Sequence, residues 1–162
     1  MSDEELKQNV SDCVAAAVEK MWLAVKSMDG ERKLCRSAIS ATYFAVFNAS
    51  KALLFACGID TTSHEDVQRQ FALHFVRSGT FPKYTSKHIS ELMSERHNAD
   101  YKLYIPLGES DVAEDVKKAV EQFVRFEQVM RENGFGDVLE QHGFDEALAG
   151  FRSLADVAAA PP

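Results

Sequence analysis

The residue best suited to chemistry in this sequence is an arginine at a position where a core residue would be expected. Arg96 continues an apolar stripe of one predicted helix, made of Ile89, Leu92 and Met93. An arginine turned inward is costly unless it is paired, and Asp100 stands one helical turn further on as a partner. The pattern therefore indicates either an ion pair that fixes the end of the helix or a positively charged cleft.

A cleft of this kind would suit a phosphate or a nucleic-acid backbone. The planar guanidinium of an arginine engages phosphate through two parallel hydrogen bonds. Tyr43 and Asn48 place polar atoms in an otherwise apolar helix and could line the same cleft, although hydrogen bonds within the core explain them equally well. The candidate binding residues are Arg96, Asp100, Tyr101, Asn48 and Tyr43, and Arg96 and Tyr101 are the catalytic candidates.

The element that must position these groups is a central helix predicted from about Glu31 to Cys57. It carries no charge between Ser37 and Ser50, and its apolar residues cover nearly the whole circumference. A helix of a soluble protein that is apolar all round is surrounded by other helices. Lys51 and several polar residues interrupt the segment, which argues against a membrane span.

The remaining pattern predicts further helices and no strand. The first helix opens with a capping box at Ser2 and Glu5 and stops near Gly30, and Gly58 caps the central helix. A third helix starts at Ser63 and ends near Gly79, with a buried face made of Val67, Phe71, His74 and Phe75. A fourth carries the Ile89–Arg96 stripe, and a fifth runs from Ser110 or Asp111 to Asn133 and Gly134.

The predicted fold class is therefore all-α. We expect an up-and-down bundle of four to five main helices over residues 1–134. Residues 135–162 form an extension with one short helix, and its end, Val157 to Pro162, is expected to fray.

Composition limits the functional classes. The 162 residues carry a formal net charge of −7, which argues against broad affinity for nucleic acids or membranes but leaves room for one basic cleft. Cys13, Cys35 and Cys57 are far apart in helical patterns, which predicts buried thiols in a reducing compartment. The acidic N-terminus is unlike a signal peptide, so we expect a cytoplasmic protein.

Several segments in order resemble the HEPN family, the higher eukaryotes and prokaryotes nucleotide-binding domain. The resemblance covers most of the chain, from about Ala15 to Gly134, and resides in Ala41–Leu54, Gly58, His64, Phe71–Gly79 and Arg96–Tyr101. It implies an all-α bundle that usually dimerises, with the arginine motifs of two subunits facing each other across a shared cleft. Many members are metal-independent ribonucleases, often toxins encoded beside a small nucleotidyltransferase antitoxin.

The chain departs from the family motif at one position. The family's ribonucleases have a histidine shortly after the arginine, but Tyr101, Lys102 and Leu103 occupy the positions where it should fall. His97 is adjacent to Arg96 and points about 100° away around the helix. Without an imidazole there, acid–base cleavage of RNA loses its usual proton carrier, whereas Arg96 can still bind phosphate. The form Arg-x-x-Ala-Asp-Tyr resembles a known subgroup of the family.

The other histidines are interpreted structurally. His88, Glu91 and Glu95 share one helical face, but a di-metal bundle needs a second such motif, so no metal and no cofactor is predicted. His74 is expected in the core, and His64 is interpreted as a capping or loop residue.

Three hypotheses follow for the function. The first is a homodimer that binds RNA or a nucleotide at Arg96, works with a nucleotidyltransferase in a toxin–antitoxin-type pair and has weak or no nuclease activity. The second is an active ribonuclease toxin that uses Tyr101 or His97. The third is a structural module for protein interaction.

Overall fold

The computed structural model describes residues 1–161 and contains seven α-helices and one π-helical turn. Within that range no strand occurs, which confirms the predicted all-α fold. In chain order the elements are α1 (Asp3–Ser27), α2 (Cys35–Ala56), α3 (His64–Phe71), the π-helical turn η1 (Ala72–Val76), α4 (Tyr84–Tyr101), α5 (Glu109–Glu132), α6 (Gly136–Gln141) and α7 (Phe144–Ala159).

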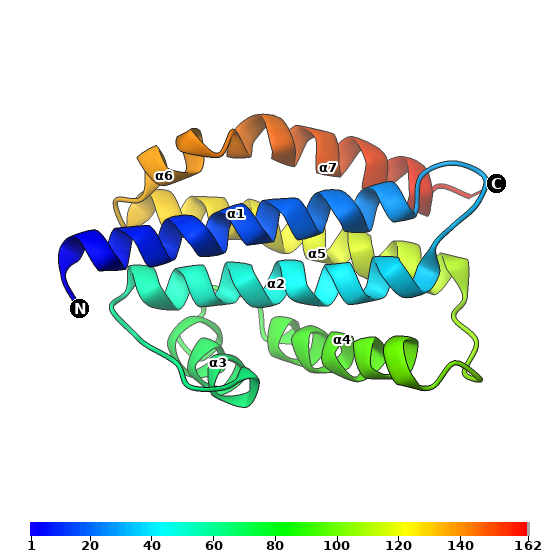
Figure 1. Ribbon diagram of the computed structural model, residues 1–162, viewed down its shortest axis with the longest axis horizontal. Coiled ribbons are helices and arrows are strands. Elements are labelled where there is room, and N and C mark those ends of the chain that lie inside the picture. Colours follow the sequence, from blue (N-terminus) through cyan, green and yellow to red (C-terminus); the bar gives the residue numbers. More distant parts are fainter. Residues whose placement is uncertain (162) are drawn as a thin grey trace.

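Helices α1 and α2 form the most extensive helix pair and run antiparallel (Figure 1). The predicted capping box is present at the start of α1, where the Ser2 hydroxyl accepts from the amide of Glu5 and the Glu5 carboxylate accepts from the amide of Ser2. Gly58 follows α2 with φ +74°, the left-handed conformation that glycine adopts readily. Helix α2 begins at Cys35, four residues later than predicted, because residues 28–34 form the connection.

Helix α2 is the centre of the molecule. It packs against α1, α4 and α5, and α4 lies beside it on the side opposite α1 (Figure 1). Among the described residues it is the one helix long and apolar enough to cross a membrane, but 67% of that window is buried inside the bundle. Its apolar character is thus accounted for by its neighbours.

Helix α3 is shorter than predicted, since the chain changes to the π-helical turn η1 after Phe71. Phe71 and Phe75 stay buried and meet Phe81 from the connection to α4, with centroid distances of 5.1 and 6.3 Å. The prediction of a core histidine at His74 is wrong: the wider π-helical turn directs it to the exposed surface.

The C-terminal extension contains more helix than predicted. Helix α7 has 16 residues and α6 precedes it, and α7 continues through Ala159, so residues 157–159 of the segment expected to fray are helical in the structure. Phe144 and Phe151 are fully buried, and α7 packs against α5 and α1. Pro162 lies outside the described residues.

The prediction of three buried thiols is also wrong. Cys57 is exposed because it lies at the C-terminal end of α2, and Cys13 and Cys35 are half-buried. All three are free, and burial raises the pKa of Cys13 and Cys35. A raised pKa disfavours the nucleophilic thiolate.

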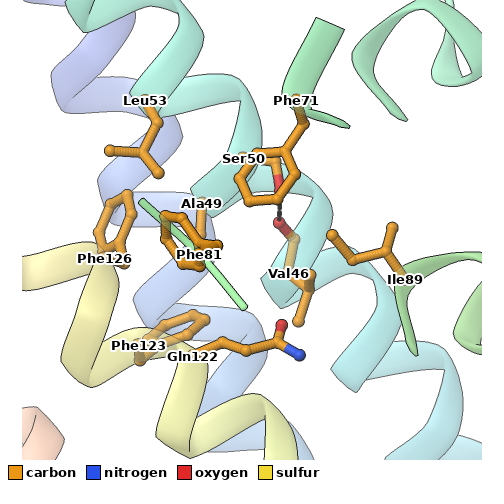
Figure 2. A pocket seen from close by; sticks show the side chains of 10 residues that line it. All are labelled: Val46, Ala49, Ser50, Leu53, Phe71, Phe81, Ile89, Gln122, Phe123 and Phe126. Carbon is orange, nitrogen blue, oxygen red and sulfur yellow. Dashed lines mark hydrogen bonds between the residues drawn. The ribbon is translucent and has the colours of Figure 1, made fainter. Parts of the chain in front are cut away.

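An apolar pocket lies in the core, away from Arg96. Figure 2 shows Phe81, Phe123 and Phe126 converging on it, and Gln122 contributes a polar side chain at its edge. Its free volume is about 10 Å³. That volume is at most one water molecule, so the pocket is a packing defect and not a ligand site.

Candidate functional site

Arg96 of α4 lies against the aromatic residues of α2. Its Cζ atom is 5.3 Å from the ring centroid of Tyr43 and 5.4 Å from that of Phe44. The side chain is 19% exposed, and its Nε atom is buried without a hydrogen-bond partner among the described residues. The aromatic faces stabilise the cation, while part of its hydrogen-bonding capacity is unused.

Asp100 neutralises Arg96 only in part. Its Oδ2 atom lies 3.6 Å from Arg96 Nη1, the long end of the range for an ion pair. The same oxygen accepts a hydrogen bond of 3.5 Å from the Ser40 hydroxyl on α2. Because Asp100 is exposed, this pair contributes little to stability and leaves the guanidinium available to an anion.

The end of α4 is held by an arginine that the sequence reading did not single out. Arg36 of α2 donates to the backbone carbonyls of Ala99 at 3.1 Å, Leu103 at 2.9 Å and Ile105 at 2.9 Å. These carbonyls lie at the C-terminus of α4 and in the following loop, where helical partners are lacking. Arg36 therefore fixes the segment that carries Asp100 and Tyr101.

A second group of rings lies next to Arg96. The Tyr43 hydroxyl shares a hydrogen bond of 2.7 Å with Nδ1 of His64, the first residue of α3. The His64 ring stacks on Phe47 with centroids 4.2 Å apart and planes inclined by 13°. The sequence suggested a capping role for His64, but the helix cap is made by Ser63, whose hydroxyl accepts from the amide of Asp66.

Phe44 stands between several cationic or titratable groups. Besides Arg96 at 5.4 Å, Lys20 Nζ of α1 lies 5.9 Å from its ring centroid, and the His64 ring centroid lies 6.4 Å away. Lys20 has no ion-pair partner within 4 Å among residues 1–161. Three helices, α1, α3 and α4, thus place groups around one aromatic side chain of α2.

The structure does not bring all the predicted site residues together. The Tyr101 side chain is 69% exposed and lies against His97, with ring centroids 5.1 Å apart. Asn48 is half-buried and donates to the carbonyl of Phe44 on its own helix. Of the five candidates, Arg96, Asp100 and Tyr43 form one contact group, while Tyr101 and Asn48 make no polar side-chain contact with it among the described residues.

The electrostatics keep Tyr43 neutral. Burial raises the pKa of its hydroxyl, and the nearby positive charge of Arg96 opposes that shift without reversing it. The Tyr43 hydroxyl is therefore a hydrogen-bond partner for His64 and not a base at neutral pH. On its outer side Arg96 borders an open hollow of about 410 Å³, together with His97, Asn98 and Lys102.

A separate polar cluster joins α4 to α5. His88 is 4% exposed, its Nδ1 accepts from Gln122 at 2.6 Å, and its Nε2 lies 3.5 Å from Asp115 Oδ1. Glu95 faces the same aspartate, and its pKa is raised to about 8, first by burial and then by the hydrogen bond to Asp115. Within residues 1–161 no group of three His, Cys, Asp or Glu side chains is arranged to hold a metal ion.

Comparison with known proteins agrees with this architecture. The model of the HEPN domain matches residues 10–130, three quarters of the chain. The chain belongs to the HEPN family.

Two relatives illustrate the range of similarity. The chain is 28% identical to "Putative toxin MJ0605" of Methanocaldococcus jannaschii over 131 aligned residues. The aligned region covers 80% of this chain and 95% of that protein. It is 41% identical over 61 residues to "UPF0332 protein PH1297" of Pyrococcus horikoshii, 38% of this chain and 43% of that protein.

A third relative is also named as a toxin. "Putative toxin MJ0142" of Methanocaldococcus jannaschii is 28% identical over 93 residues, which cover 54% of this chain and 63% of that protein. This HEPN protein is thus similar to two proteins of Methanocaldococcus jannaschii that are named as putative toxins.

Proposed function

We propose that this HEPN protein binds RNA or a nucleotide through Arg96, as the partner of a nucleotidyltransferase in a toxin–antitoxin-type pair. The observation that supports this most strongly is the environment of the Arg96 guanidinium. It is held by two aromatic rings, is half-buried, and has only one distant carboxylate as counter-charge. An arginine in this environment can replace its weak ion pair with Asp100 by hydrogen bonds to a phosphate.

We propose that the nuclease activity of this site is weak or absent. Cleavage of RNA needs a group that transfers a proton close to the phosphate. The side chains where the family motif has its histidine are Tyr101, Lys102 and Leu103, and all three are exposed. Binding through Arg96 does not depend on such a group.

The family resemblance also suggests a homodimer. Tyr101, Leu103 and Tyr104 expose 69%, 68% and 80% of their surfaces beside the end of α4. Large exposed aromatic and aliphatic side chains in a small area are typical of protein contacts. We propose that this segment contacts a second subunit in the cytoplasm, close to the Arg96 cleft.

One observation favours the alternative, an active ribonuclease. His97 and Tyr101 are neighbours on the exposed side of α4, so a proton-carrying ring does lie one residue from Arg96. This pair is the candidate for acid–base chemistry in the second hypothesis.

Incubation of the purified protein with total RNA separates the two functions. In a filter-binding assay we expect the Arg96→Ala variant to bind several-fold less RNA than the wild type. The wild type should not shorten the RNA. Cleavage by the wild type that is lost in Arg96→Ala and His97→Ala would show a ribonuclease instead. Equal retention by the wild type and Arg96→Ala would contradict a binding role for Arg96.

A further inference from the structure

The half-buried residues of α2 form a stripe that lies between α1 and α4. Ser40, Phe44, Phe47 and Asn48 belong to it, and their spacing places them on one side of the helix. At 1.5 Å per residue this stripe is about 12 Å long. It is the side of the central helix that neither neighbouring helix covers completely.

Cationic groups border this stripe on both sides. Lys20 reaches it from α1 and Arg96 from α4, and both lie within 6 Å of the ring centroid of Phe44. Among residues 1–161 Lys20 has no ion-pair partner within 4 Å and Arg96 has the long pair with Asp100, so this region holds two cations against the one carboxylate that contacts Ser40. Such a region attracts phosphate more strongly than any single cation would.

His64 borders the same stripe from α3, and its orientation is fixed. Stacking on Phe47 and the hydrogen bond between Nδ1 and the Tyr43 hydroxyl set both the plane and the rotation of the ring. The Nδ1 atom is occupied by Tyr43, so Nε2 is the nitrogen that can meet a ligand. Within residues 1–161 no hydrogen bond engages His64 Nε2, and the residue is half-buried.

We propose that Lys20 and His64, with Arg96, hold the phosphate backbone of a single-stranded nucleic acid along this stripe, while Phe44 and Phe47 fix the positions of these three groups. This inference rests on the proposed function and adds residues from α1 and α3 to it. Basic groups interleaved with aromatic side chains are the arrangement that binds single strands without sequence preference. A stripe of this length suits more than one phosphate.

Fluorescence anisotropy with a short fluorescein-labelled oligouridylate tests the proposal. We expect Lys20→Ala and His64→Gln each to weaken binding by roughly three- to tenfold, and Lys20→Ala to lower the salt dependence by about one phosphate contact. The matched control is Lys26→Ala, because Lys26 also lies on α1 over an aromatic ring, that of Trp22 at 5.4 Å, and does not border the stripe. Its affinity should equal that of the wild type.

The outcomes distinguish this inference from the proposed function. If Arg96→Ala weakens binding while Lys20→Ala and His64→Gln behave like Lys26→Ala, the inference is wrong and the proposed function stands. If Arg96→Ala also binds like the wild type, both fail.

A measurement on the wild-type protein tests the proposal even if the variants do not fold. The histidine ring signals in an NMR titration with the oligouridylate should include a shift of His64, and an unshifted His64 would overturn the proposal. A change in oligomeric state for Lys20→Ala, with unchanged oligouridylate binding, would assign the stripe to a second copy of the chain instead.

Discussion

Glu95 shows how a single side chain links α4 to α5. As a carboxylate its Oε2 atom would be buried without a partner, next to the carboxylate of Asp115. With a proton it can donate to Asp115; burial raises the pKa of Asp115, but the neighbouring His88 and Glu95 outweigh that effect and lower it. The pair therefore shares one proton at neutral pH.

This proton makes stability depend on pH. The folded-state pKa of Glu95, about 8, exceeds the ordinary value of 4.5, so the folded protein binds the proton more tightly than the unfolded chain. The favourable contribution is complete below pH 4.5 and is lost as the pH rises to about 8. Glu95→Gln keeps a donor for Asp115 but cannot ionise.

We expect Glu95→Gln to raise the free energy of unfolding at pH 9 by roughly 1–3 kcal/mol relative to the wild type, with no gain at pH 4.5. Urea unfolding at both pH values measures this difference, with Glu121→Gln, an exposed glutamate of α5, as the control. The same difference at both pH values would mean that Glu95 is not the titrating group.

At this scale the sequence predicted some members of the contact group around Arg96 and missed others. Arg96, Asp100 and Tyr43 could be found because a polar residue on an apolar face interrupts a regular pattern. Lys20 and Arg36 gave no such signal, since a basic residue at the edge of an amphipathic helix is ordinary. Their roles depend on which neighbouring helix lies opposite, a property of tertiary packing and not of local spacing.

The fourth helix depends on the second for its position. Arg36 supplies three hydrogen bonds to carbonyls of the α4 terminus and the following loop. A cation at a helix C-terminus also interacts favourably with the helix dipole. The loop after α4 carries the exposed Tyr104 and Leu103, so the same arginine orients the segment proposed as a subunit contact.

We expect Arg36→Ala to lower the free energy of unfolding by roughly 1–3 kcal/mol, because partly buried carbonyls lose a charged donor. Amide hydrogen exchange should accelerate at the end of α4 and in residues 102–107, while α1 keeps its protection. Arg32→Ala, an exposed arginine of the preceding loop, is the control. Unchanged exchange in α4 would show that Arg36 does not hold the helix.

The contact of α7 with α1 depends on a glycine. A Cβ atom at Gly150 would lie 2.4 Å from Cη2 of Trp22, and Trp22 also packs edge-on against Phe151 at a centroid distance of 4.7 Å. An alanine in a helix is ordinarily more favourable than glycine by roughly 0.5–1 kcal/mol. The close approach reverses that expectation here.

We expect Gly150→Ala to destabilise the protein by roughly 1–3 kcal/mol and to shift the fluorescence of Trp22, the one tryptophan in the chain, to longer wavelength. Ala149→Ser, at an exposed neighbouring position, should leave the emission unchanged. A stabilised Gly150→Ala protein with native emission would mean that the indole moves aside without cost.

Helix types were easier to predict than their lengths. The capping residues Ser2 and Ser63 and the glycines 30, 58 and 134 are local signals, and the helix boundaries follow them closely. The π-helical turn after Phe71 and the full length of α7 were missed. In both cases packing of aromatic side chains on the bundle decides the backbone, as Phe81 and Phe151 show.

At the scale of the whole molecule, the chain is a HEPN bundle with a C-terminal cover. Helices α1, α2 and α5 are packed from one side by α7 and from the other by α3 and α4 (Figure 1). The chain has a net charge of −7, and Lys20 and Arg96 both lie beside the stripe on α2. An acidic protein can therefore present one defined site for phosphate and little affinity elsewhere.

The most direct test of this account is the salt dependence of RNA affinity for the wild type and Arg96→Ala. Arg152→Ala, an exposed arginine of α7, is the matched control for the loss of one charge. We expect Arg96→Ala to bind several-fold more weakly with a salt slope reduced by about one contact, and Arg152→Ala to match the wild type. Equal affinities and slopes for all three proteins would contradict the assignment of Arg96 as the phosphate-binding residue.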